Sequence, residues 1–189
     1  MTSKIIIRLF LGLVFLQLLV PYSMIAKREI VLRQGVAYKF KVAPVDPYDA
    51  FRGRYVALRT QENVVPVAPQ MKVSYGQAVY ALISVDEQGF ARLTGISLQR
   101  PGGQSYLRAK VSSSRYENKV HLNLLLDRYY MEESAAPRAQ ELYRKHTAKA
   151  DRKDSYILVR VKDGFAVIEN LYVGGEKIED AVKNPALLK

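Results

Sequence analysis

The chain opens with its longest run of uncharged, mostly apolar residues. Lys4 and Arg8 are followed by residues 9–26, which carry no charge and are apolar on every side rather than on one face. A helix needs about 20 apolar residues to span a bilayer. The pattern therefore predicts a membrane-spanning signal anchor over residues 5–26 that stays on the protein. A cleaved secretory signal and a buried core helix are the alternatives.

Cleavage and orientation depend on the ends of this run. A cut after Ala26 would place Met24 three positions before it, where signal peptidase sites favour a small residue. Basic residues stand on both sides of the run, so the charge rule alone does not orient it. The N-terminal tail is very short and its charges lead the apolar run, as in a signal sequence. We therefore expect residues 28–189 to lie outside the cytoplasm.

Beyond residue 27 the pattern changes to short segments in which apolar and polar residues alternate. At residues 37–42 three apolar side chains alternate with Lys39 and Lys41, as in a half-buried strand. Residues 78–85 are apolar on both faces, which predicts a central strand. Glycine-containing turns separate the segments. Further strands are expected over residues 55–60, 90–98, 106–111, 119–124, 155–161 and 165–173.

One amphipathic soluble helix is predicted over residues 137–148. Ser134 suits its N-cap and Pro137 its first turn. A second, short helix is expected near residues 178–182. Three apolar residues of the first helix should pack inward: Ala139, Leu142 and Tyr143.

Together these elements predict a mainly β protein of the α+β class. Residues 1–27 form the transmembrane anchor, and residues 28–189 form an antiparallel β domain that carries the helix near 137–148. The domain could be an open sheet, a barrel or a sandwich, and the pattern alone does not choose among them.

Two of the expected hairpins share a sequence pattern. The segment Val85-Asp86-Glu87-Gln88-Gly89-Phe90-Ala91 resembles Val161-Lys162-Asp163-Gly164-Phe165-Ala166, with one residue fewer in the second turn. Apolar residues then recur together, Ile96 with Leu171 and Leu98 with Val173. The likeness indicates either two ordinary hairpins with similar turns or a pseudo-twofold domain built from two related hairpins.

The composition narrows the classes of function. The chain has 189 residues, no cysteine and two histidines, which removes thiol chemistry and argues against a histidine-rich metal site. We expect no cofactor and no metal. The net charge is +11, which suits anionic lipid, nucleic acid or an acidic partner. Because the basic residues are scattered and no nucleic-acid motif is recognisable, nucleic acid is not expected as a partner.

The loop that follows the first strand has the highest density of special residues. Asp46 and Asp49 can accept hydrogen bonds from backbone amides in turns, and Arg52 matches either carboxylate with its planar fork. Gly53 permits a positive φ, and Tyr55 presents a ring with a polar tip at the next strand. One interpretation is a self-satisfied structural loop. The other is an exposed site that holds a ligand or a peptide.

Positions 46–58 have the pattern Asp46-Pro47-x-Asp49-x-x-Arg52-Gly53-x-Tyr55-x-x-Leu58. This pattern resembles the signature of the GDYXXLXY-domain family, bacterial membrane-anchored proteins without an established activity. Two positions depart from it, since Arg54 replaces the family's aspartate and Thr60 its last tyrosine. The likeness covers most of residues 28–175. It includes a secondary cluster of candidate functional residues: Arg108, Arg128, Tyr129, Tyr130 and Glu133.

The resemblance implies a single-pass protein of the bacterial inner membrane with a periplasmic C-terminal domain. Such proteins are often encoded beside multi-pass membrane proteins. We therefore expect a binding or accessory domain of unestablished biochemical role that acts with an integral membrane protein. The membrane lipid would contact residues 5–26.

The alternative is a membrane-anchored hydrolase. Asp46, Asp49 or Glu133 would act as acid and base, and Arg52 would hold an anionic group of the substrate. For the segment at residues 127–133 we favour a capping role instead, because Glu132 and Glu133 come just before the helix and suit its positive end. Neither histidine has a partner at the spacing of a catalytic triad. We therefore assign no catalytic residue, and the balance is against an enzyme.

Overall fold

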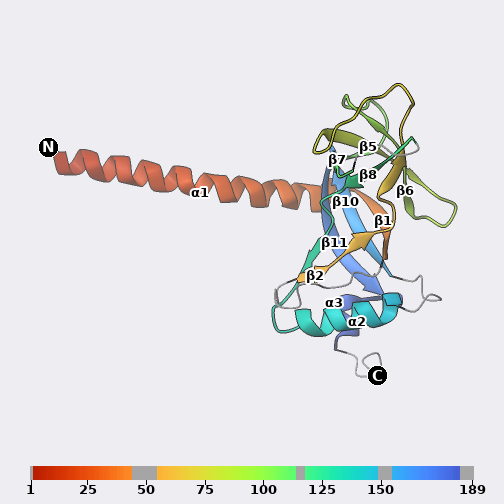
Figure 1. The fold of residues 1–189 in the computed structure, drawn as a ribbon. Coiled ribbons are helices and arrows are strands. Elements are labelled where there is room, and N and C mark those ends of the chain that lie inside the picture. Colours follow the sequence, from red (N-terminus) through yellow and green to blue (C-terminus); the bar gives the residue numbers. More distant parts are fainter. Residues whose placement is uncertain (1, 44–54, 114–117, 149–154, 184–189) are drawn as a thin grey trace.

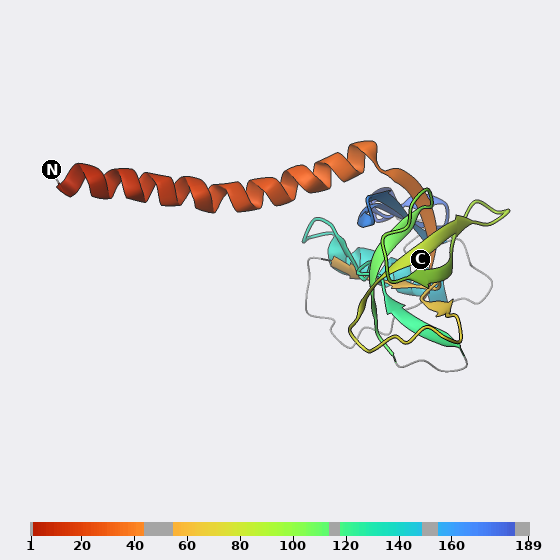
Figure 2. The ribbon, with the colours of Figure 1, turned by 90° about the horizontal axis from the view of Figure 1, so that it is seen from above.

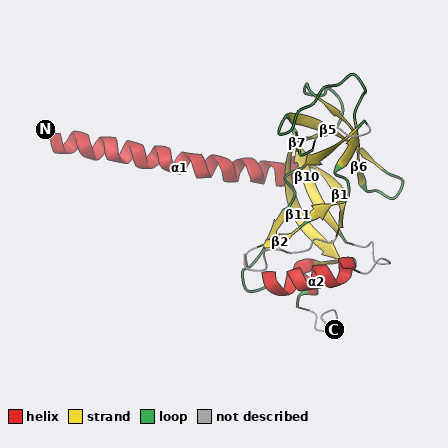
Figure 3. Cartoon of the chain, viewed as in Figure 1, coloured by secondary structure: helices red, strands yellow, loops and turns green. Residues whose placement is uncertain are grey.

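The computed structural model describes residues 2–43, 55–113, 118–148 and 155–183. A long helix, α1 (Thr2–Gln34), leaves one side of a strand-rich domain (Figures 1 and 2). Helix α2 (Ala136–Ala148) covers one end of that domain (Figure 3). The predicted mainly β class with one long N-terminal helix is confirmed.

Helix α1 is long and apolar enough to cross a membrane, by length and composition, as a signal sequence also is. At about 1.5 Å per residue its 33 residues span about 50 Å. Its large apolar side chains from Ile5 to Ile25 are exposed, so the alternative of a buried core helix is wrong. Pro21 lies inside the helix, as is tolerated in membrane spans.

The helix continues past the expected boundary of the anchor at residue 27. Its last turns pack on strands β10 (Tyr156–Lys162) and β11 (Phe165–Val173), and Val31 is only 3% exposed there. The Lys27 ammonium lies 4.5 Å from the centre of the Phe165 ring. The end of α1 is therefore part of the domain rather than a linker to it.

Gly35 joins α1 directly to strand β1 (Val36–Ala43). Its amide donates to the Val31 carbonyl (2.8 Å). A Cβ at this position would lie 2.4 Å from that carbonyl oxygen and 3.1 Å from the Val161 amide nitrogen. The close approach of helix and sheet therefore requires glycine. The side chain of Lys162 donates a further hydrogen bond to Gln34, across the same junction.

The first sheet has the order β12-β11-β10-β1-β3, and all its pairs are antiparallel. It includes the short strands β3 (Arg59–Thr60) and β12 (Glu176–Lys177). In β1 the predicted alternation is confirmed, with Tyr38, Phe40 and Val42 buried.

The second sheet has the order β4-β8-β7-β5-β6 and is also antiparallel. Strands β2 (Tyr55–Ala57) and β9 (Arg128–Tyr130) form a separate two-stranded ribbon. No closed barrel forms within the described residues, and the buried faces share one core. The strands of the second sheet are β4 (Val64–Pro66), β5 (Ala78–Val85), β6 (Ala91–Ser97), β7 (Tyr106–Val111) and β8 (Lys119–Asn123).

The two hairpins with similar sequences also share a structural irregularity. In each, the register shifts by one residue and leaves a bulge on the second strand, Thr94 in β5–β6 and Glu169 in β10–β11. Thr94 stands four positions after Phe90, and Glu169 stands four positions after Phe165. A bulge at the same place in both repeats favours the hypothesis of two related hairpins.

The contacts made by the two hairpin tips are reciprocal. Phe90 of the first hairpin bridges to Lys39 in β1, which pairs with the second hairpin. Gly164 of the second hairpin accepts a hydrogen bond from the amide of Arg108 (2.9 Å) in β7, which pairs with the first. The units β1-β10-β11 and β7-β5-β6 are thus related by an approximate twofold arrangement.

The predicted helix over residues 137–148 is α2, which begins one residue earlier at Ala136 and has its three expected apolar residues buried. Its Gln140 side-chain oxygen accepts from the amide of Ala57 in β2 (2.8 Å), and its Tyr143 hydroxyl donates to the Ala43 carbonyl (2.5 Å). The short helix expected near residue 178 is α3 (Ile178–Ala181). Helix α2 therefore supports the ribbon that carries Tyr55.

Two segments differ from the predicted elements. The strand expected over residues 55–60 is divided at Leu58. Its amide donates to the Asp127 carbonyl (2.9 Å), one step further in the β2–β9 register, and the chain then pairs with β1 as β3. The segment assigned to a helix cap, residues 127–133, contains strand β9, which pairs with β2. Three residues are too few to show an alternating pattern, so β9 depends on its partner rather than on its own sequence.

Candidate functional site

The signature residues divide between a loop and a strand. Asp46, Pro47, Asp49, Arg52 and Gly53 lie outside the described residues. The structure places the remaining two, Tyr55 and Leu58, in and just after β2. Leu58 is 5% exposed and belongs to the core, as does Val56, and Thr60 is also buried. The second half of the signature therefore has a packing role, except at Tyr55.

Tyr55 is half-buried and lies beside two residues of the secondary cluster. It pairs with Tyr130 across the β2–β9 ribbon, and their ring centres are 5.8 Å apart at an angle of 61°. The Arg128 guanidinium carbon lies 5.2 Å from the centre of the Tyr55 ring, in range of a cation–π contact. The sequence thus identified separately three residues that the fold brings together, here called the Tyr55–Arg128–Tyr130 cluster.

This cluster carries a permanent positive charge at the protein surface. The Tyr130 side chain, and then the nearby Asp127 carboxylate, raise the pKa of the Arg128 guanidinium above its ordinary value. The Arg128 Nε atom lies 3.6 Å from the Asp127 Oδ2 atom, and both side chains are substantially exposed. An exposed pair of this kind contributes little to stability. The charge and the two rings therefore remain available to a ligand.

Tyr129 points the other way and is structural. It is buried, and its hydroxyl donates a hydrogen bond to the Glu179 carboxylate of α3. Burial, with the negative charge of Glu179, raises the pKa of the Tyr129 hydroxyl well above its usual range. Tyr129 therefore fixes β9 to the core, and its outward neighbours Arg128 and Tyr130 form the exposed face of the strand.

A cavity of about 420 Å³ separates the cluster from the last turns of α1. Arg28 and Leu32 of α1 line one side of it, and Leu125, Arg128 and Tyr130 line another. Both overall views place the β2–β9 ribbon on the side of the domain from which α1 leaves (Figures 1 and 2). The cluster therefore stands next to the segment that follows the apolar span.

Leu125 is the functional candidate that sequence reasoning missed. It is 64% exposed and has a φ of 56°, a backbone conformation that is rare and costly for a leucine. Its amide is held by the side chain of Asn123 (2.9 Å). A signal was present in the sequence, because Leu124 and Leu126 alternate inward and leave the middle leucine facing solvent.

The other two residues of the secondary cluster lie elsewhere. Arg108 is exposed on β7 and lines a separate cavity that uses other residues of α1. Glu133 is exposed in the segment between β9 and α2. The structure therefore brings together Tyr55, Arg128 and Tyr130, and it does not bring Arg108 or Glu133 to them.

The chemistry of the cluster suits recognition. An arginine flanked by two tyrosines has the composition of a binding hot spot, and Leu125 adds exposed apolar area beside it. Among the described residues no group of three or more His, Asp or Glu side chains could hold a metal ion. Asp46, Asp49 and Arg52 of the hydrolase alternative lie outside the described residues, and nothing observed favours that alternative.

Comparison with known proteins gives one match. The family model described as GDYXXLXY protein matches residues 17–171, which is most of the chain. No curated protein and no solved structure matches it. The chain therefore belongs to the GDYXXLXY family.

Proposed function

We propose that this member of the GDYXXLXY family is a single-pass protein of the bacterial inner membrane whose periplasmic domain binds an integral membrane protein. The contact is made by the Tyr55–Arg128–Tyr130 cluster together with Leu125. The observation that carries the proposal is the place of this cluster, beside Arg28 and Leu32 at the end of the apolar helix. A partner embedded in the same membrane reaches this face first.

The helix supports an uncleaved anchor. Its residues 27–34 are helical and pack on the sheet, so a cut after Ala26 would divide one continuous helix. It would also expose an apolar hollow, because Ala26 and Ile30 line the same cavity against β11. An anchor that remains in place keeps both sides of that hollow together.

The exposed residues support a binding role. Tyr130 is 60% exposed and Leu125 is 64% exposed, although both are large and apolar in part. Leu125 also adopts a costly backbone conformation that contributes nothing to the core. Strain and exposed apolar area at one place are typical of surfaces that contact a partner.

Site-specific photo-crosslinking tests the proposal. A benzophenone amino acid replaces Tyr130 in the full-length protein, which is expressed in its native membranes and irradiated. We expect a discrete adduct of higher mass that Arg128→Gln weakens, because that change removes the charge beside the ring. Tyr75 is 78% exposed and lies in the β4–β5 connection, so it serves as the matched control position.

The proposal is tested by comparing the crosslinked adducts from positions 130 and 75. An adduct from position 130 that is absent from position 75 supports a specific membrane partner, whose identity mass spectrometry then gives. No adduct from position 130, or the same adduct from both positions, contradicts the proposal.

A further inference from the structure

We propose that the cavity between α1 and the β10–β11 hairpin binds one anionic phospholipid. The cavity has a volume of about 670 Å³ and is distinct from the one beside Tyr130. The phosphate would lie at Arg108, with Lys27 and Lys162 nearby, and an acyl chain would follow α1 toward Leu19. This assignment concerns a lipid rather than the protein partner proposed above.

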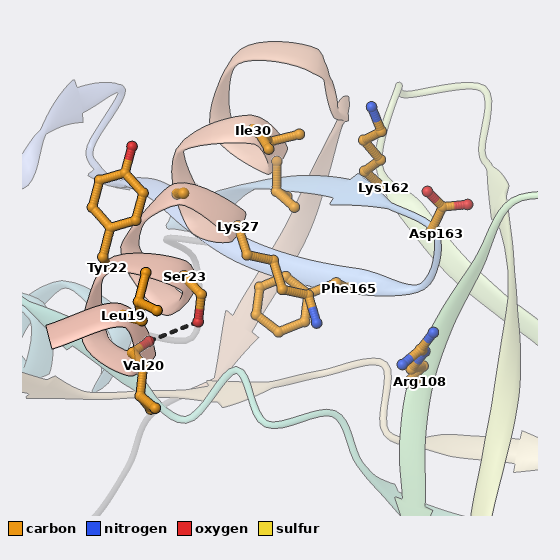
Figure 4. A pocket seen from close by; sticks show the side chains of 12 residues that line it. Leu19, Val20, Tyr22, Ser23, Lys27, Ile30, Arg108, Lys162, Asp163 and Phe165 are labelled. Atoms are coloured by element: carbon orange, nitrogen blue, oxygen red, sulfur yellow. Dashed lines mark hydrogen bonds between the residues drawn. The ribbon is translucent and has the colours of Figure 1, made fainter. Parts of the chain in front are cut away.

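The two ends of the cavity differ in character. Leu19, Val20 and Tyr22 stand at one end, and Arg108, Lys162 and Asp163 stand at the other (Figure 4). The apolar end belongs to the membrane-spanning part of α1. From Leu19 to Lys27 the helix rises about 12 Å. The cavity therefore has the polarity of a phospholipid that lies along the helix with its head toward the domain.

The charges at the polar end leave a positive surplus. The Asp163 carboxylate is already paired, since its Oδ1 atom lies 2.5 Å from Nη2 of Arg100. Lys162 donates to the neutral amide of Gln34 and keeps its charge uncompensated. The side chain of Arg108 makes no hydrogen bond or ion pair within the part of the chain that the structure describes. An anion is the ligand that this end complements.

The residue that corresponds to Arg108 in the related half of the domain has interaction partners within the protein. Tyr80 pairs with Arg108 and the corresponding Tyr156 pairs with Lys41, so Lys41 is the counterpart of Arg108. Lys41 donates to the Gln88 side chain (3.0 Å) and lies 4.5 Å from the centre of the Phe90 ring.

Where α1 joins the domain, this arrangement changes. The counterpart of Phe90 is Phe165. Its ring is contacted by Lys27 of α1, whose ammonium lies 4.5 Å from the ring centre. Arg108 is thereby left without the partners that its counterpart has. The addition of the helix creates both the apolar wall and the unpaired cation, on one side of the molecule only.

The ligand class follows from these groups. An arginine fork matches two oxygens of a phosphate, and lysines add charge without fixed direction. A basic pocket beside a membrane helix suits an anionic head group. A zwitterionic lipid carries its own cation and gains less from three positive side chains. Phosphatidylglycerol is therefore preferred to phosphatidylcholine.

Native mass spectrometry of the full-length protein in mild detergent tests this assignment. Dimyristoyl phosphatidylglycerol and dimyristoyl phosphatidylcholine, which share their acyl chains, are titrated separately. We expect one phosphatidylglycerol to bind in preference to phosphatidylcholine. Arg108→Gln should weaken phosphatidylglycerol about fivefold, since one basic residue near a membrane surface is worth about 1 kcal/mol. Arg144→Gln, at an exposed position on α2, should leave binding unchanged.

Three outcomes would overturn the proposal. Equal binding of the two lipids would mean an apolar groove without head-group recognition. If the Arg108→Gln variant bound phosphatidylglycerol as tightly as the unchanged protein, Arg108 would not be the residue that holds the phosphate. Glycerol phosphate without acyl chains, bound as tightly as the lipid, would indicate a simple anion site. If Arg108→Gln lowers the melting temperature, Lys27→Gln replaces it, because Lys27 is exposed on α1 and its loss should weaken binding in the same direction.

Discussion

At the scale of single residues, Leu125 combines two features that do not favour the stability of the fold. Its side chain is exposed and its φ is 56°. The left-handed conformation costs a non-glycine residue roughly 1–2 kcal/mol, whereas glycine adopts it without steric penalty. A residue that lowers stability and adds nothing to the core is consistent with the binding role proposed above.

Two substitutions separate the backbone from the side chain. Leu125→Gly should raise the free energy of unfolding by about 1 kcal/mol, which corresponds to a melting temperature about 3 °C higher. Leu125→Ala keeps the strained backbone and should change the melting temperature little. Both variants lose the leucine side chain, so both should weaken the photo-crosslink from position 130. A crosslink that survives in both variants would assign Leu125 no part in binding.

At the scale of elements, the proposed anchor α1 would orient the domain as well as hold it at the membrane. Its last turns are packed on β10 and β11, and Gly35 joins it to β1 without intervening coil. The rotation of α1 about its axis is therefore fixed relative to the Tyr55–Arg128–Tyr130 cluster. An insertion that rotates the domain about the axis of α1 should therefore turn the cluster away from the partner.

Insertions in α1 test this coupling. One alanine between Ser23 and Met24 turns the domain about 100° relative to the span, and four alanines turn it only about 40° past a full turn. We expect the single insertion to abolish the crosslink from position 130 and the fourfold insertion to retain more of it. The packing of residues 27–34 is unchanged in both, which a thermal melt checks. Equal crosslinking by both variants would show that the phase of the helix is irrelevant.

The sequence predicted the elements that carry their own pattern. Strands β7 and β11 begin and end where the alternation predicted, and α2 begins one residue before its expected start. Strands β4 and β9 have three residues each and depend on pairing with a strand that is distant in the sequence, and the two-residue β12 depends on the hairpin that it forms with β11. The Tyr55–Arg128–Tyr130 cluster was found as separate residues for the same reason, because it forms only when β2 pairs with β9.

At the scale of the whole molecule, the proposed orientation is open to direct measurement. The chain has no cysteine, so a single introduced cysteine gives an unambiguous label. We expect Tyr75→Cys to react with a membrane-impermeant maleimide in intact spheroplasts, since Tyr75 lies on the proposed periplasmic domain. A cysteine at Thr2, on the opposite side of the span, should react only after lysis. The reverse pattern would place the domain in the cytoplasm.

The direct junction at Gly35 has a consequence for the strength of any complex. In the proposed complex, a partner in the membrane would meet this protein at two places, the span within the bilayer and the cluster above it. Because no flexible linker separates the span from the cluster, contact at the span holds the cluster at a fixed distance and angle from the partner. The second contact then forms without loss of chain entropy. Two individually weak contacts can therefore act as one strong one, but only with partners whose own geometry matches the spacing.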